Sequence, residues 1–369
     1  MPIEMKRIAR TKIVATLGPA SADYGIILRM VKAGMDVARL NFSHGSWEEH
    51  FDKVKNIRTV NKKYRRHVRI LQDLEGYRIR VCRLSKGGVK DLRKKSEVWI
   101  TRGVDQGEPD VIPFDYAGDL RKIRPGQLIY IDDGNIILKA KSAARDRMKA
   151  EVIEGGILKE RKGVNMPGVK IPFSGLTPKD TEDIKFGIKH KVDYVAQSFV
   201  RTAKDVETVK KLIKPHSPGS RVIAKIESRE AIRNIDDIID VSDGIMIARG
   251  DMGIAVPIYE IPVIQKTIIK KCNRKRKFVI TATQMLEHMT EHSRPTRAEV
   301  TDVANAIFDG TDFAMLSAES ASGSYPVESV RMMDRIIKYT EGYINKCAAK
   351  STQRGFRAPT RQDGMLTSA

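Results

Sequence analysis

Short runs of apolar and β-branched residues recur along most of the chain, and amphipathic stretches separate them. Eight of these runs are typical of strands: Thr11–Leu17, Asp36–Phe42, Val68–Leu74, Tyr194–Phe199, Val222–Ile226, Gly244–Ala248, Phe278–Thr283 and Phe313–Ser317. Stretches typical of helices lie at Ile26–Ala33, Trp47–Asn61, Ala203–Ile213, Arg229–Ile239, Pro262–Arg274 and Arg297–Phe308. This alternation predicts parallel strands that are joined by helices.

The alternation is interrupted after the third run. From about residue 77 to residue 167 the pattern changes to short strands and turns, with strand-like segments at Ile79–Leu84, Glu97–Thr101, Gln127–Ile131, Asn135–Ala140 and Met148–Ile153. Turn signals such as Arg124-Pro125-Gly126 separate these segments. The α/β pattern resumes at Thr177-Pro178-Lys179-Asp180, which predicts the start of a helix. We therefore expect a small all-β domain inserted into the first domain.

Eight strand–helix units favour an α/β fold of the (β/α)8 TIM-barrel class, with the small β domain inserted after the third strand. The alternative is a doubly wound open sheet, but its usual glycine fingerprint does not occur in a strand–helix context. We expect a discontinuous barrel domain at residues 1–76 and 168–349, the inserted domain at 77–167, and a polar tail at 350–369.

Composition limits the class of protein. A hydrophobic content of 41% is enough for a large core. The cysteines Cys82, Cys272 and Cys347 lie far apart, which argues against a disulfide framework and a zinc site and favours a reducing compartment. No apolar run approaches the ~18 residues of a membrane span. The run Ile13–Leu17 is too short for the core of a signal peptide. We expect a cytoplasmic protein without a membrane partner.

The formal net charge of +21 suggests an anionic partner. The basic residues are spread along the whole chain, and no aromatic residues are interleaved with them for base stacking. We therefore do not predict nucleic acid as the partner, because a basic protein equally attracts small polyanionic substrates.

The fifth and sixth runs end in charged residues. Lys225 and Glu227 point the same way because side chains alternate along a strand, and Asp251 follows the next run. A hard cation such as Mg²⁺ needs one or two carboxylates plus substrate oxygens, and a lysine beside it suits a phosphoryl group in transfer. The alternative is that Lys225 and Glu227 only cap a strand.

Polar residues also follow the other predicted strands, where a TIM barrel collects its chemistry. They are Arg39, Asn41, Ser43, His44, Asp73, Arg78, Arg80, Ser198, Arg201, Arg249, Gly250, Thr281, Thr283, Gln284, Ser317 and Glu319. Such a ring fits a site for a small, highly charged ligand held by cations and Mg²⁺.

Six motifs, in order, resemble those of the pyruvate kinase family between about residues 11 and 345. They are Thr11-Lys12-Ile13-Val14-Ala15-Thr16-Leu17-Gly18-Pro19-Ala20-Ser21, Val37-Ala38-Arg39-Leu40-Asn41-Phe42-Ser43-His44-Gly45, Lys162-Gly163-Val164-Asn165-Met166-Pro167-Gly168, Ala224-Lys225-Ile226-Glu227, Ala248-Arg249-Gly250-Asp251-Met252-Gly253 and Ala282-Thr283-Gln284-Met285-Leu286.

The resemblance implies a glycolytic phosphotransferase that moves the phosphoryl group of phosphoenolpyruvate to ADP. It implies that Glu227 and Asp251 hold Mg²⁺, with Mn²⁺ as an alternative. It also implies that Lys225 acts at the phosphoryl group and that Arg39 contacts the phosphate. The implied contacts of the substrate carboxylate are Gly250, Asp251 and Thr283. Thr283 would also relay the proton, Ser317 and Glu319 would support the proton route, and Arg80 and Lys162 would contact the nucleotide. The inserted domain would act as a lid that excludes water.

This chain departs from the family pattern in the region that binds K⁺ in many members. That region corresponds to Asn41, Ser43, Asp73 and Leu74, where threonine is usual at Leu74 and an acidic residue at Arg78. We expect the fixed guanidinium to replace the monovalent ion, so that K⁺ is not required. Tyr77 stands in place of a usual proline, Ala255 in place of a usual glutamate, and Ala318 in place of a glycine.

The family usually has a further C-terminal domain that binds an effector, and the sequence stops soon after the eighth strand and its helix. We expect no regulation at that site, and a homo-oligomer that forms through the barrel domain.

Two alternative functions stay open. One is another Mg²⁺-dependent barrel enzyme that handles phosphoenolpyruvate or pyruvate, such as an aldolase or mutase. The other is a catalytically idle basic binding protein. ADP dependence separates the first alternative from the kinase.

Overall fold

A computed structural model describes residues 9–84, 89–103, 110–132, 134–169 and 176–353. Eight parallel strands form a closed barrel in the order β1-β16-β15-β14-β13-β12-β3-β2, which confirms the predicted fold class. Their bounds are β1 Lys12–Thr16, β2 Met35–Asn41, β3 Arg69–Asp73, β12 Tyr194–Gln197, β13 Arg221–Ile226, β14 Gly244–Ala248, β15 Phe278–Ala282 and β16 Phe313–Leu316. Strand β12 ends before Phe199, contrary to the prediction, because Phe199 adopts a left-handed backbone with φ 54°.

The α-helices are α1 Tyr24–Ala33, α2 Trp47–Tyr64, α3 Pro178–Lys189, α4 Ala203–Ile213, α5 Arg229–Arg233, α6 Ile235–Val241, α7 Arg249–Ala255, α8 Ile261–Arg274, α9 Arg297–Asp309, α10 Ala318–Ala321 and α11 Pro326–Gln353. Short 3-10 helices lie at η1 Pro19–Ser21, η2 Leu120–Lys122, η3 Ile258–Glu260 and η4 Glu287–Thr290. Helix α11 includes the start of the predicted tail, and residues 354–369 lie outside the described residues.

The prediction of one helix at Arg229–Ile239 is wrong, because the chain forms two helices that meet at Asn234. This residue has ψ 17° and so leaves the helical region. Its side-chain Nδ2 donates a 2.9 Å hydrogen bond to the carbonyl of Arg201. That long-range contact stabilises a break that the apolar periodicity could not indicate.

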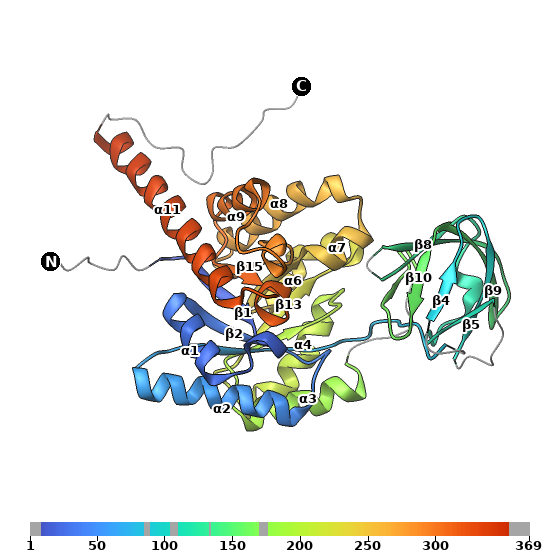
Figure 1. Cartoon of the computed structure of the whole chain (residues 1–369), viewed down its shortest axis with the longest axis horizontal. Helices are drawn as coiled ribbons and strands as arrows, with labels where there is room; N and C mark the ends of the chain where they lie inside the picture. The colour runs from blue at the N-terminus through green and yellow to red at the C-terminus, as the bar shows by residue number, and fades with distance from the viewer. Residues whose placement is uncertain (1–8, 85–88, 104–109, 133, 170–175, 354–369) are drawn as a thin grey trace. The chain divides into compact units, whose positions relative to one another are not determined.

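The chain divides into two compact units, which we describe separately. Unit 1 comprises Met1–Arg39, Asp52–Arg69 and Ile280–Ala369, and unit 2 comprises Leu40–Phe51 and Ile70–Val279. In unit 1, β1 pairs in parallel with β2 and β16. Helix α11 packs against α1 and α9 (Figure 1).

In unit 2, β12 pairs with β3 and β13, and β13 pairs with β14, all in parallel. Every residue of β14 is buried. Strands that are buried on both faces are typically continuous apolar runs, as this one is. Helix α3 begins as predicted, with Thr177 and Asp180 forming a capping box and Pro178 at the first turn.

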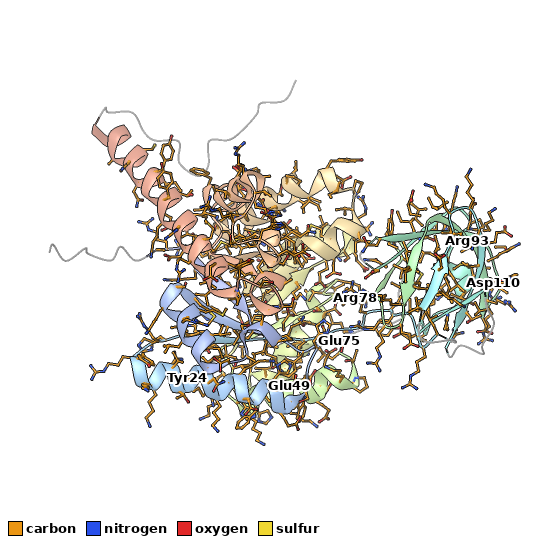
Figure 2. All side chains as sticks on the ribbon, viewed as in Figure 1. Tyr24, Glu49, Glu75, Arg78, Arg93 and Asp110 are labelled. Carbon is orange, nitrogen blue, oxygen red and sulfur yellow. The ribbon has the colours of Figure 1, made fainter. Side chains whose placement is uncertain are left out.

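The segment after β3 forms its own sheets, with bounds β4 Val89–Leu92, β5 Glu97–Arg102, β6 Val111–Phe114, β7 Leu128–Ile131, β8 Ile136–Ala143, β9 Arg147–Glu154, β10 Gly156–Lys159 and β11 Val164–Asn165. Six strands follow the order β11-β7-β8-β9-β5-β6, and β10 pairs with β4. Strands β4, β5, β8, β9 and β10 lie together in Figure 1. Their inner side chains form one core, whereas charged side chains such as Arg93 and Asp110 are exposed (Figure 2).

Two features of this segment differ from the prediction. The expected strand Ile79–Leu84 is wrong, because these residues form only isolated bridges, Arg80 with Gly163 and Val81 with Phe114. Strands β4, β6 and β10 were not expected. Each is only four residues long, and a short strand of this kind gives a weak periodic signal.

Candidate active site

Lys225 lies at the centre of a buried polar cluster at the carboxyl ends of β3, β12 and β13. Its Nζ lies 3.2 Å from Asp73 Oδ1 and 3.1 Å from Glu227 Oε1, and it donates a 2.7 Å hydrogen bond to Ser198 Oγ. The Lys225 side chain is 11% exposed, whereas the two carboxylates are fully buried. The structure thus brings together Lys225 and Glu227, as the strand alternation predicts, and adds Asp73 to the pair.

The neighbouring strand end fixes the side chain of Glu227. Its Oε2 accepts a 2.6 Å hydrogen bond from the backbone N–H of Phe199. Burial raises the pKa of Glu227, Lys225 opposes that effect, and the charge of Asp251 raises the pKa further. A further cation placed between Glu227 and Asp251 would therefore be stabilised by both carboxylates.

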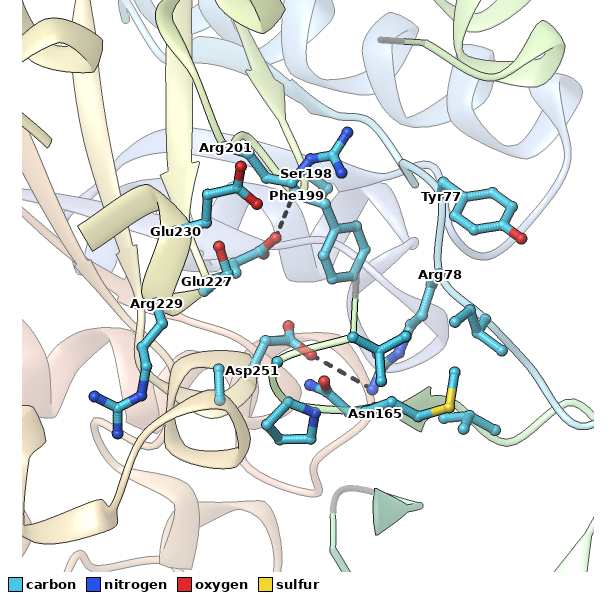
Figure 3. A pocket seen from close by; sticks show the side chains of 18 of the residues that line it. Tyr77, Arg78, Asn165, Ser198, Phe199, Arg201, Glu227, Arg229, Glu230 and Asp251 are labelled. Carbon is cyan, nitrogen blue, oxygen red and sulfur yellow. Dashed lines mark hydrogen bonds and ion pairs between the residues drawn. The ribbon is translucent and has the colours of Figure 1, made fainter. Parts of the chain in front are cut away.

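Asp251 lies in the first turn of α7, directly after β14. Gly250 precedes it in the same turn. The guanidinium of Arg78 contacts this carboxylate, with Nη2 3.4 Å from Asp251 Oδ1. Figure 3 shows Glu227 and Asp251 facing the same pocket, with Arg78 on the far side of Asp251.

These groups line a pocket of about 430 Å³ in unit 2. Arg78, Glu227 and Asp251 contribute charged groups to its wall, and Tyr77 and Phe199 contribute aromatic rings (Figure 3). The wall also contains the charged residues Arg201, Asp205, Arg229, Glu230 and Arg233. A cavity of this size accommodates a small ligand, and its many charged side chains favour a charged one.

Glu227 and Asp251 supply the kind of oxygen donors that a divalent cation needs. Glu227 Oε1 is buried and forms no hydrogen bond of normal geometry with the described residues. Within that part of the chain, no three His, Cys, Asp or Glu side chains are arranged to hold a metal alone. Mg²⁺ takes one or two carboxylates and completes its shell with substrate oxygens and water. The donor set therefore fits an ion that is shared with a substrate.

The two residues expected at the nucleotide already hold ion pairs. Arg80 Nη2 lies 2.6 Å from Glu75 Oε1, and Arg80 Nη1 donates a hydrogen bond to the carbonyl of Arg161. Lys162 Nζ lies 2.7 Å from Asp132 Oδ1. The bridge between Arg80 and Gly163 brings the two segments together. Arg80 and Lys162 are thus neighbours, and each is partly exposed.

The residues of the expected monovalent-cation region lie around the ends of β2 and β3. The backbone N–H of Phe42 donates to the carbonyl of Asp73, which aligns the two strand ends. Asn41 Oδ1 accepts a hydrogen bond from the N–H of Ser43. Leu74 is buried. The guanidinium of Arg78 contacts Asp251 and so turns toward the divalent-cation donors.

The residues expected at the phosphate and on the proton route lie in unit 1. Arg39 is 8% exposed, and its Nη1 donates a 2.8 Å hydrogen bond to Thr16 Oγ1. Thr283 follows β15 with φ 68°, and Gln284 follows with φ 51°. A β-branched residue rarely adopts a positive φ, so this conformation is strained and is maintained by the surrounding structure.

Glu319 connects the two loops after β15 and β16. Its Oε1 accepts a hydrogen bond from the N–H of Leu286, and its Oε2 accepts one from the N–H of Ser317. Burial raises the pKa of the Glu319 carboxyl, and these backbone donors oppose that effect. Glu319 thus fixes the position of Ser317 and of the segment after Thr283.

Three contributing residues were missed or given no role by the sequence. Ser198 accepts from Lys225 and donates to the carbonyl of Leu74. Glu75 is the partner of Arg80. Gly163 leaves space for the Arg78 side chain. The only sequence signal for Gly163 is its place beside Lys162 in a recognised motif.

The model of the family described as "Pyruvate kinase, barrel domain" matches residues 8–330. The chain belongs to the pyruvate kinase family. This confirms the family resemblance of the six motifs, which all lie within the matched range.

Several curated pyruvate kinases are similar to this chain. The enzyme of Thermococcus litoralis is 48% identical over 334 residues, which is 90% of this chain and 70% of the relative. Those of Geobacillus stearothermophilus and Bacillus licheniformis are 46% and 45% identical, over 91% of this chain in each case. The chain spans only 57% and 58% of the length of these two relatives.

Among the described residues of this pyruvate kinase family member, no helix is both long enough and apolar enough to cross a bilayer.

Proposed function

We propose that this chain transfers the phosphoryl group of phosphoenolpyruvate to ADP, giving ATP and pyruvate. The observation that supports this most directly is the placement of Lys225 between Asp73 and Glu227, in a chain that belongs to the pyruvate kinase family. Glu227 also lines one pocket together with Asp251. An aldolase or mutase acting on the same substrate would have no requirement for ADP.

The test is a coupled assay that follows pyruvate formation in the presence of Mg²⁺. We expect pyruvate to form only when both phosphoenolpyruvate and ADP are present, with ATP produced in equal amount. Pyruvate formed without ADP would indicate the alternative barrel enzymes, and no turnover under any condition would contradict the proposal.

In the proposed reaction, an oxygen of the ADP β-phosphate bonds to phosphorus as the bond between phosphorus and the enol oxygen breaks. The ammonium of Lys225 would neutralise the phosphoryl group during transfer, and its contacts with Asp73 and Glu227 support this role by fixing its position. Glu227 and Asp251 would hold Mg²⁺, or Mn²⁺, which when bound supplies positive charge to the substrate oxygens. The backbone N–H groups of Gly250 and Asp251 would bind the substrate carboxylate.

The enolate that remains takes a proton on its terminal carbon to become pyruvate. We assign the residues of unit 1 to this step and to phosphate binding. Arg39 would contact the phosphate, and Thr283 would orient the substrate and relay the proton. Ser317 and Glu319 would support the proton route, since Glu319 accepts hydrogen bonds from the N–H groups of Ser317 and Leu286.

We assign the nucleotide to Arg80 and Lys162, and propose that residues 77–167 act as a lid domain on a barrel domain of residues 1–76 and 168–349. The separate core of the inserted sheets supports this division. Nucleotide binding would have to replace the ion pairs of Arg80 with Glu75 and of Lys162 with Asp132. Closure of such a lid would exclude water from the transfer.

We propose that K⁺ is not required. Leu74 is a buried hydrocarbon side chain at a position where an oxygen ligand is expected. Arg78 carries a permanent positive charge, and its guanidinium would supply to the expected cation region a charge that does not depend on a dissolved ion.

We also propose a homo-oligomer that forms through barrel helices. Ile258, Tyr259 and Val263 are 76%, 77% and 67% exposed, and they lie close together in η3 and α8. A cluster of exposed large apolar side chains is typical of an interface.

We also propose a cytoplasmic location, because the wide spacing of the cysteines suits a reducing compartment.

A further inference from the structure

Arg78 is the cationic neighbour of a carboxylate that we assign to the divalent metal. Its Nη2 lies 3.4 Å from Asp251 Oδ1, and the two side chains are 28% and 24% exposed. Both residues line the same pocket, and Figure 3 shows the guanidinium directed at the carboxylate. The contact joins the segment that enters the inserted sheets to the first turn of α7.

Gly163 provides the other side of the Arg78 position. A Cβ atom added to Gly163 would lie 2.3 Å from Nε, 2.6 Å from Cζ and 2.7 Å from Nη2 of Arg78. The guanidinium therefore lies directly against the backbone of Gly163, where a larger residue would displace it. The backbone of Gly163 is outside the left-handed region, so this glycine is needed for space and not for its φ angle.

The strand contacts fix Gly163 beside Arg78. Arg80 forms a bridge with Gly163, and the N–H of Val164 donates a 2.7 Å hydrogen bond to the carbonyl of Ile79. Arg78 is thus held between a backbone surface behind it and Asp251 in front of it. This is a built position for a cation.

The carboxylates of the site have different cationic neighbours. Lys225 contacts Asp73 and Glu227, whereas Arg78 contacts Asp251. A divalent ion bound to Asp251 would bring two positive groups to one carboxylate. Their repulsion would drive the flexible guanidinium away from the metal.

We propose that Arg78 is an internal counter-ion of Asp251 that competes with the divalent metal, so that metal binding requires its displacement. This inference rests on the proposed function only in that it takes Asp251 as a metal ligand. It assigns Arg78 a role in the metal-free protein, whereas the K⁺ proposal concerns the loaded enzyme. Gly163 is then a positioning residue, because it determines where the guanidinium rests.

The test is a titration with Mn²⁺ in the absence of substrates, in which electron paramagnetic resonance measures the free ion. We expect Arg78→Gln to bind Mn²⁺ about three- to tenfold more tightly than the unaltered chain, because a partly exposed ion pair and the repulsion of one nearby charge each contribute a small factor. Equal or weaker binding by Arg78→Gln would overturn the proposal.

Gly163→Ala tests the geometry while Arg78 is still present. The added methyl group should displace the guanidinium and also tighten Mn²⁺ binding, and the double variant Arg78→Gln/Gly163→Ala should bind no more tightly than Arg78→Gln alone. A second, additive gain in the double variant would contradict the assigned role of Gly163. If Gly163→Ala does not fold, the Arg78→Gln titration still decides the proposal.

Arg80→Gln is the matched control. It removes the same charge two residues away, but Arg80 pairs with Glu75. We expect its Mn²⁺ affinity to stay close to that of the unaltered chain, and an equal gain would show that general electrostatics explain the effect. Asp251→Asn should weaken binding strongly, and unchanged binding would overturn the metal assignment. None of these titrations needs turnover, so a failure of the kinase proposal is distinguishable from a failure of this one.

Discussion

A single lysine determines the electrostatics of the candidate site. Lys225 lies within 3.2 Å of two fully buried carboxylates, and each of those would otherwise carry an uncompensated charge. The sequence indicated the pairing of Lys225 with Glu227 through their two-residue spacing. It could not indicate Asp73, which comes from a strand more than a hundred residues earlier. The sequence thus predicts contacts between residues on the same strand, whereas contacts between residues on different strands depend on the fold.

We expect Lys225→Met to lower kcat by a factor of about 10³ or more, because the positive charge at the transferring phosphoryl group is lost. The variant should also lose about 3–5 kcal/mol of unfolding free energy, since two buried carboxylates lose their cation. The coupled assay measures the rate at a temperature where circular dichroism shows the variant folded. Lys271→Met, which removes a partly exposed lysine paired with Asp236, should retain its rate. Retention of most activity in Lys225→Met would contradict the assignment.

The Arg78 charge leads to a prediction for monovalent ions. We expect similar turnover in buffers with K⁺ and in buffers with neither K⁺ nor NH₄⁺, because the Arg78 guanidinium would supply the charge of the monovalent ion. The coupled assay at constant ionic strength measures this. A fall of turnover by orders of magnitude without K⁺ would contradict the prediction.

At the scale of elements, one carboxylate connects three of them. Asp243 precedes β14, its Oδ1 lies 2.8 Å from Lys210 Nζ of α4, and its Oδ2 accepts a 2.7 Å hydrogen bond from the N–H of Val222 in β13. Burial by itself would raise the pKa of Asp243, but Lys210 and the Val222 N–H lower it overall. The ionised form is therefore favoured in the folded state.

We expect Asp243→Asn to lower the unfolding free energy by about 1–2 kcal/mol at pH 7, because charge-assisted hydrogen bonds are lost. The stabilisation by Asp243 is present above the pKa of the unfolded chain and is lost as the pH falls through the lowered folded pKa, so the difference should vanish in strong acid. Urea unfolding as a function of pH measures it. Asp240→Asn, which removes an exposed pair with Lys275, should cost less than about 0.5 kcal/mol. An equal loss in both variants would contradict the argument.

The bounds of helices and strands agree with the sequence prediction where the pattern of apolar residues is long and regular. The strands of the barrel were recognisable because a strand buried on both faces needs a continuous apolar run. The break at Asn234 and the end of β12 at Gln197 were not, because they depend on a side chain bonding to another loop and on the positive φ of Phe199. Residue types alone carry no signal for such contacts.

At the scale of the whole molecule, the eight barrel strands are parallel and their sheet is closed. Residues that follow these strands therefore come from distant parts of the sequence but lie at the same end of the barrel. The family match, over residues 8–330, covers all eight of these strands. The exposed apolar side chains of η3 and α8 are not explained by the candidate site, and the proposed interface with a second copy would account for them.

We expect the chain to be at least a dimer at micromolar concentration, and Tyr259→Glu to shift it toward the monomer, because a charge would be buried in the apolar contact. Light scattering coupled to size-exclusion chromatography measures the mass. Tyr339→Glu is the control, because Tyr339 is also exposed but lies on α11. A monomeric unaltered chain would contradict the prediction.

The amino-acid order by itself determined the fold class, the family and the types of side chain at the strand ends, because apolar periodicity and short motifs are local properties. Only the tertiary structure decided which charges meet: Asp73 with Lys225, Arg78 with Asp251, and Arg80 with Glu75. The physical reason is that an ion pair depends on a separation of a few ångströms in space, and barrel closure and loop packing set that separation.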